Sequence, residues 1–186
     1  MKCINMENQA QFLSQFFCQR YLNFTGMEDS KKDDFVQMIR ALWNEQKSRE
    51  LLYLEALKKD SMGPCRRILS QGHVSALLFQ KEIKWIYDYF KCFLTDKELG
   101  DVNHITARTA LKMLEDVEEK EQIASCLKRI EAGTLKLYKR LRTLVDRDSE
   151  ARMMLDEHLI RISEFYEALS KLEGSNMKSV GYTAAA

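Results

Sequence analysis

The sequence of 186 residues has little that interrupts a helix, since it contains one proline and seven glycines. Domains rich in β-strands need frequent turns, and these two residue types form most turns. Long apolar runs are also missing, so we expect neither a signal peptide nor a membrane span. With 45% hydrophobic and 31% charged residues, the composition is that of a folded globular protein rather than a disordered chain. We therefore predict an all-α protein.

The chain also lacks an excess of charge of either sign, with 29 basic and 28 acidic residues. Nucleic acids attract proteins through clustered positive charge, so we do not expect them as partners. The five cysteines are scattered without a Cys-x-x-Cys pair, which argues against a disulfide framework and a structural zinc site. Free thiols are typical of a reducing compartment. We expect a cytoplasmic protein.

Four long segments carry apolar side chains at alternating intervals of three and four residues. This spacing places them on one stripe of a helix, which must be buried against another helix. The segments are 31–59, 64–94 and the two halves of 119–173, which a short break near 146–148 separates. In the third segment, the predicted stripe consists of Leu127, Ile130, Thr134, Leu137, Leu141 and Leu144. In the fourth, it consists of Leu155, Leu159, Ile162, Tyr166 and Leu169.

Two helical hairpins joined by a long connection indicate an antiparallel four-helix bundle. The connection consists of a polar loop over 95–103 and a short helix over 104–114. We predict an extra N-terminal aromatic helix within 1–28, the bundle over 29–173 and a flexible tail over 174–186.

The N-terminal segment has an aromatic stripe that includes Phe12, Phe16, Phe17 and Tyr21. Leaving such a stripe in water is costly, so it must pack against another surface. It packs either on its own bundle, on a second copy in a homo-oligomer, or in the groove of a protein partner.

Bundles of this layout often hold two metal ions between a Glu from each of two helices and a Glu-x-x-His motif from each of the others. None of the three histidines has a glutamate three residues before it. Four glutamates nevertheless fall near the apolar stripes: Glu50, Glu82, Glu131 and Glu164. Burying four carboxylates is costly without a cation. They either form a metal site or lie at the edges of the stripes, where Arg49 and Arg161 are available partners.

Three segments resemble a family of uncharacterised bacterial ferritin-like proteins, whose domain is a four-helix bundle with a crossover helix. They are RELLYLEALKK (49–59), ILSQGHVSALLFQKEI (68–83) and SCLKRIEAGTLKLYKRL (125–141), and ALSKL (168–172) fits the closing helix. The similarity covers about residues 33–173. It implies a ferritin-like bundle in a bacterial protein.

The resemblance implies a ligand set that this chain keeps in part. The family's acids fall on Glu82 and Glu131, but others fall on Leu51, beside Glu50, and on Ser75, and the histidine of the last helix falls on Tyr166. We therefore expect a non-catalytic bundle that has lost its metal centre and acts through protein association. One alternative is an iron- or manganese-binding protein with ferroxidase activity. Another is a bundle that binds a small molecule or lipid through its aromatic residues at 79–93, which an apolar cavity would favour.

Overall fold

The computed structural model describes residues 29–90, 104–147 and 149–174. The chain divides into two units, Met1–Asp34 and Phe35–Ala186, and the bundle belongs to the second. The predicted N-terminal helix with Phe12, Phe16, Phe17 and Tyr21, and the predicted tail beyond Gly174, lie outside the described residues.

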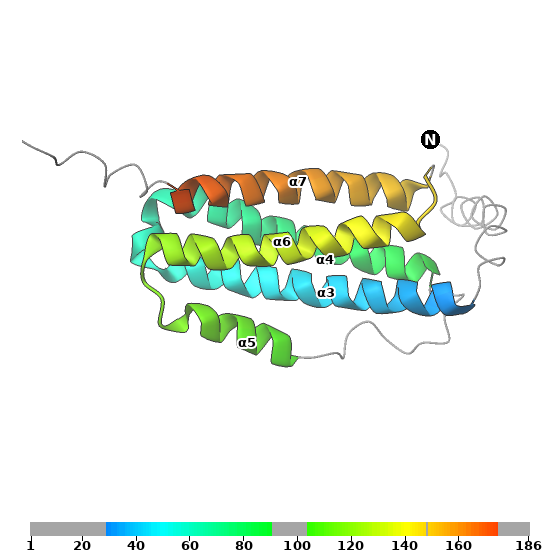
Figure 1. The fold of residues 1–186 in the computed structure, drawn as a ribbon, viewed down its shortest axis with the longest axis horizontal. Helices are drawn as coiled ribbons and strands as arrows, with labels where there is room; N and C mark the ends of the chain where they lie inside the picture. Colours follow the sequence, from blue (N-terminus) through cyan, green and yellow to red (C-terminus); the bar gives the residue numbers. More distant parts are fainter. Residues whose placement is uncertain (1–28, 91–103, 148, 175–186) are drawn as a thin grey trace, which may run out of the picture. The chain divides into compact units, whose positions relative to one another are not determined.

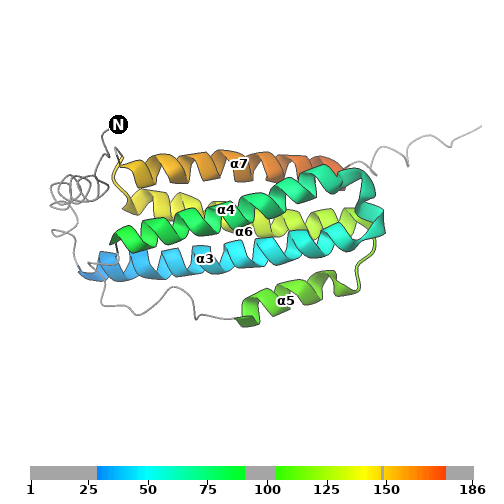
Figure 2. The same ribbon diagram turned by 180° about the vertical axis from the view of Figure 1, so that it is seen from behind.

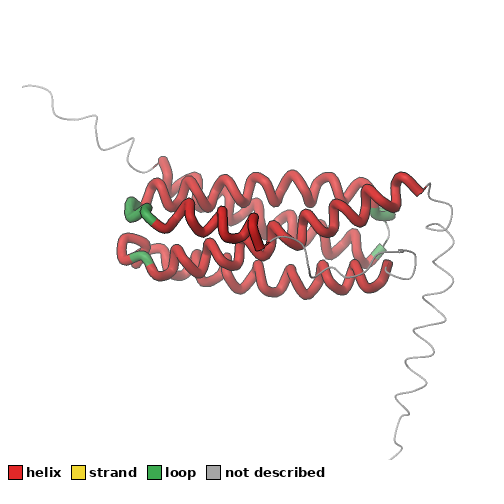
Figure 3. Tube along the Cα trace, turned by 90° about the horizontal axis from the view of Figure 1, so that it is seen from below, coloured by secondary structure: helices red, strands yellow, loops and turns green. Residues whose placement is uncertain are grey.

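The described residues form helices joined by short loops, without a strand (Figure 3). This confirms the predicted all-α class for that part of the chain. The elements are α3 (Asp29–Lys58), the 3-10 helix η1 (Asp60–Cys65), α4 (Arg66–Phe90), α5 (His104–Glu115), α6 (Lys120–Leu144) and α7 (Glu150–Glu173). None of these helices combines the length and the apolar character that crossing a membrane requires.

Four long helices lie side by side, and neighbouring helices run antiparallel (Figures 1 and 2). Hydrogen bonds connect α3 to α6 and to α4, and α7 packs against both α6 and α4. The helices therefore form a closed ring in the order α3, α4, α7, α6. Because α4 and α6 run in the same direction, the chain between them, which includes α5, returns along the bundle (Figure 1).

Local sequence signals set the ends of these helices. Ser149 precedes α7, and its hydroxyl accepts a hydrogen bond from the Arg152 amide at 3.1 Å, which caps the helix in place of a backbone carbonyl. Pro64 was predicted to open the second long helix, but it lies inside η1 and α4 begins two residues later. The physical reason is that proline has no amide hydrogen to donate within a continuous α-helix. A short 3-10 helix tolerates the missing hydrogen bond.

Helix α5 lies outside the four long helices, at the side of α3 and α6 (Figures 1 and 2). Leu114 at its end is fully buried in a cluster with Ile123 of α6 and Leu52 of α3. Lys59, just after α3, donates hydrogen bonds to the Glu115 carbonyl at 3.0 Å and to the Glu118 carboxylate at 2.7 Å. The end of α3 therefore holds the turn between α5 and α6.

The buried side of α6 differs from the predicted stripe. Leu127, Thr134 and Leu141 are buried as predicted, whereas the predicted Ile130, Leu137 and Leu144 are half-buried. Glu131 and Tyr138 are fully buried instead. An α-helix turns by about 100° per residue, so the next residue along is almost as well placed for the core. The partners available across the bundle decide between them.

The same correction applies to α7. Leu155, Ile162 and Leu169 are buried as predicted, but Leu159 and Tyr166 are half-buried. Their places in the core are taken by His158 and Phe165. The core of the bundle therefore contains a polar layer that hydrophobicity alone does not predict.

Candidate functional site

A charged pair occupies the middle of the bundle. Arg49 of α3 and Glu131 of α6 both have side chains with 0% exposure. The Arg49 Nε and Nη2 atoms donate hydrogen bonds to Glu131 Oε1 at 3.1 and 2.9 Å. The Tyr53 hydroxyl donates a third to the same oxygen at 2.5 Å. This carboxylate is thus held by three donors from one neighbouring helix.

Arg49 keeps its positive charge in this buried position. Burial by itself lowers the pKa of Arg49, but the charge of the Glu131 carboxylate and its hydrogen bond oppose this, and the pKa lies above its ordinary value. Burial and the Glu131 charge raise the pKa of Tyr53 well above its usual range. Tyr53 therefore stays protonated, and its hydroxyl donates a hydrogen bond to Glu131.

A chain of hydrogen bonds leads from Arg49 towards the surface. Arg49 Nη1 donates to Gln46 Oε1 at 2.6 Å, and Gln46 Nε2 donates to the Tyr138 hydroxyl at 3.1 Å. Tyr138 Oη lies 2.8 Å from His158 Nδ1. His158 Nε2 lies 2.5 Å from Glu82 Oε2. Residues of all four long helices are therefore joined in one network.

The direction of these bonds fixes the state of His158. The Gln46 amide already donates to Tyr138, so the Tyr138 proton points to His158 Nδ1, and the ring proton sits on Nε2 and points to Glu82. Burial, aided by the charge of Arg49, lowers the pKa of His158 to about 3. Burial raises the pKa of Tyr138. His158 is therefore a neutral donor to a carboxylate at neutral pH.

The four glutamates predicted near the stripes lie in different surroundings. Glu131 is fully buried, and Glu82 is half-exposed at the end of the network. Glu50 accepts a hydrogen bond from Gln80 at 2.7 Å, outside the core. Glu164 is exposed and pairs with Arg161 at 3.0 Å. The arginines named from the sequence as partners, Arg49 and Arg161, do pair with two of these carboxylates.

These residues do not fit a metal ion at the centre of the bundle. Across the described ranges, no group of three or more His, Cys, Asp or Glu side chains lies close enough to share one. Glu131 Oε2 is buried without a hydrogen-bond partner in that same part of the chain, but the other oxygen carries the Arg49 guanidinium. A metal ion there would meet a permanent positive charge in a medium of low dielectric constant.

Sequence reasoning missed His158. It has no glutamate three residues before it and so fits no metal motif, but Leu155, His158, Ile162, Phe165 and Leu169 have the same alternating spacing as an apolar stripe. That spacing is the signal that would have found it. Phe79 stacks on its ring, with a centroid distance of 3.7 Å and an angle of 19° between the planes.

A groove opens between α4 and α7 beside this network. Its volume is about 430 Å³, and its walls include Val74, Leu78, Phe79 and Phe165. His158 and Glu82, the last two members of the hydrogen-bond chain, also line it. The groove is the part of the site that a molecule from solvent can reach.

Comparison with known proteins gives the chain no family. No family model matches the sequence, and no match is found among curated proteins or solved structures. The ferritin-like resemblance therefore stays a prediction.

Proposed function

We propose that this chain is a non-catalytic, ferritin-like helical bundle that acts through protein association. The observation that carries the non-catalytic part is the Arg49–Glu131 pair, with both side chains at 0% exposure in the middle of the bundle. A buried arginine with a fixed carboxylate partner occupies the centre of the core and offers no open coordination position. The free thiols of Cys65 and Cys126 are in keeping with a cytoplasmic setting.

The outer surface of α4 supports association. Val74 and Leu78 are each 51% exposed, and Leu77 and Trp85 are each 37% exposed. Their spacing places them on the side of α4 that faces away from the buried Ala76 and Ile83. We call these four residues the α4 patch.

The composition of the α4 patch resembles the centre of an interface. Apolar and aromatic residues lie in the middle, and charged residues such as the Lys84–Asp88 pair flank them. Exposed apolar residues gathered on one helix mark contact surfaces more often than scattered ones do. We take the partner to be a second copy of this chain, because two-fold contacts between identical patches are the commonest form of assembly.

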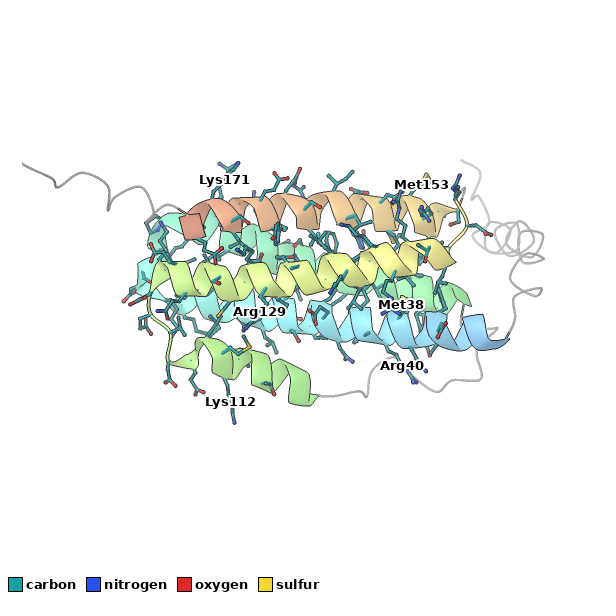
Figure 4. All side chains as sticks on the ribbon, in the orientation of Figure 1. Met38, Arg40, Lys112, Arg129, Met153 and Lys171 are labelled. Atoms are coloured by element: carbon teal, nitrogen blue, oxygen red, sulfur yellow. The ribbon has the colours of Figure 1, made fainter. Side chains whose placement is uncertain are left out.

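The experiment is a mass measurement by light scattering after size-exclusion chromatography. The wild-type protein is expected at twice the mass of one chain, and the double variant Leu77→Glu/Trp85→Glu at the mass of one. Ile160→Glu is the matched control, because Ile160 is 64% exposed but lies on α7. Met153, also on α7, points away from the bundle and serves equally well (Figure 4).

Deletion of residues 1–26 shows which of two predicted contact surfaces forms the interface, the N-terminal aromatic segment or the α4 patch. If this deletion alone gives a single chain, the interface is the aromatic segment with Phe12 and Phe16 rather than the α4 patch. A wild-type protein that is monomeric at every concentration tested, with no protein partner, would refute the proposal.

A further inference from the structure

The groove between α4 and α7 combines apolar walls with a polar floor. Phe79 and Phe165 are 7% and 5% exposed, so they form part of the core as well as of the wall. Ser75 and His158 are buried at its base. The volume of about 430 Å³ falls within the range of small-molecule sites, which is about 300–1,000 Å³.

Two carboxylates line this groove, and neither forms an ion pair with a lysine or arginine of the described ranges. Glu82 accepts a hydrogen bond from neutral His158, and Glu157 has no ion pair with any residue of the described ranges. Burial raises the pKa of Glu82, and the charge of Glu157 raises it further. The two negative charges are therefore close enough to repel each other, and a cation between them would relieve the repulsion.

The positive charges nearby are already paired. Arg161 lines the groove but forms an ion pair with Glu164 at 3.0 Å. Arg49 lies behind the wall, with its Cζ atom 5.9 Å from the ring centroids of Phe79 and Phe165. Its charge is balanced by Glu131. The groove is thus apolar in its walls and acidic at its polar edge.

We propose that this groove binds a small organic cation, with an aromatic or aliphatic body against Phe79, Leu78 and Phe165 and a protonated amine between Glu82 and Glu157. The apolar body of the ligand buries the apolar wall of the groove, and its ammonium group gives the two carboxylates a positively charged hydrogen-bond donor. An anion would meet both carboxylates. A bare metal ion would leave the apolar walls unused.

The probe is 2-phenylethylamine, which is protonated at neutral pH, with 2-phenylethanol as its neutral counterpart. Binding to the full chain is measured by titration calorimetry, and the site is located by chemical-shift changes in ¹H–¹⁵N spectra. We expect the amine to bind more tightly than the alcohol, and the shifts to cluster on the α4 and α7 residues of the groove.

Three variants test the role of charge. Glu157→Gln is expected to weaken amine binding about fivefold, and Glu82→Gln/Glu157→Gln to weaken it more and to abolish the preference for the amine. Glu167→Gln is the matched control: it removes an exposed carboxylate from the same helix, outside the groove, and leaves the Arg161–Glu164 pair intact. Its affinity is expected to stay within about twofold of wild type, as for a distant surface charge.

Equal binding of amine and alcohol would overturn the proposal, as would equal losses of amine affinity in Glu157→Gln and Glu167→Gln. So would the absence of groove shifts at millimolar amine. If the amine fails to bind while Glu157→Gln changes the mass of the assembly, the groove belongs to a protein contact instead. Val74 and Leu78 belong to both the α4 patch and the groove wall, but the α4 patch variant changes neither of them. Loss of the dimer in that variant, with amine binding retained, would show that the ligand site does not depend on association.

Discussion

At the scale of single residues, the bundle depends on a charged pair that has no contact with water. Removing one partner leaves the other charged and buried. This lowers the free energy of unfolding by far more than the intact pair adds to it. Arg49→Met is expected to lower the free energy of unfolding by about 3–5 kcal/mol, because it leaves the Glu131 carboxylate without its main donors. The exposed pair offers a control, and Arg161→Met is expected to cost less than about 1 kcal/mol.

The double variant Arg49→Met/Glu131→Met distinguishes a missing partner from a packing defect. Removing both charges is expected to recover about half or more of the loss, since no unpaired charge remains. Urea unfolding of the wild type, Arg49→Met, Glu131→Met and the double variant gives the coupling energy between the two residues. Strict additivity of the two single losses would contradict the proposed role of the pair.

His158 makes the stability depend on pH. Its pKa is about 3 in the folded protein and near 6.5 in the unfolded chain, so below pH 6.5 the unfolded state binds a proton that the folded state does not. Its contribution is thus present above pH 6.5 and is lost as the pH falls towards 3. Between pH 7 and 5 we expect a loss of about 2 kcal/mol that His158→Gln does not show. Parallel unfolding profiles of the two proteins over this range would contradict the assignment.

At the scale of helices, α3 and α4 approach closely because Gly72 has no side chain. A Cβ at Gly72 would lie 2.5 Å from Cζ and 2.7 Å from Cδ1 of Tyr53. Tyr53 cannot move away, since its ring is buried and its hydroxyl is bound to Glu131. Gly72→Ala is therefore expected to destabilise the protein by about 1–3 kcal/mol, in spite of the better helix propensity of alanine.

Gly133→Ala is the matched control for this prediction. Gly133 also lies in the middle of a helix, but a Cβ there would meet the end of the flexible Glu45 side chain. Glu45 can turn away, so the variant is expected to be neutral or stabilised by up to about 1 kcal/mol. Thermal unfolding of Gly72→Ala and Gly133→Ala checks both expectations. Equal effects on stability would show that Tyr53 does not limit the approach of α3 and α4 at Gly72.

At the scale of the whole molecule, the α4 patch links association to stability. A protein that dimerises in its folded state becomes more stable as its concentration rises, by mass action. The thermal midpoint of the wild type should therefore increase with concentration, and that of Leu77→Glu/Trp85→Glu should not. This readout is independent of the mass measurement.

The sequence by itself determined the helices. Alternating intervals of three and four residues and few turn-forming residues are local properties, so they predicted the all-α class and helix ends close to those observed. Leu155, Ile162 and Leu169 also follow from the spacing alone.

The tertiary structure alone decided which polar residues enter the core. Glu131 and His158 are poor candidates for burial by hydrophobicity, and they become favourable only when Arg49 and Tyr138 arrive from other helices to satisfy them. The groove with Glu82 and Glu157 likewise exists only where α4 and α7 meet. Periodicity reports the face of one helix, whereas a hydrogen-bond partner or a cavity wall belongs to two helices at once.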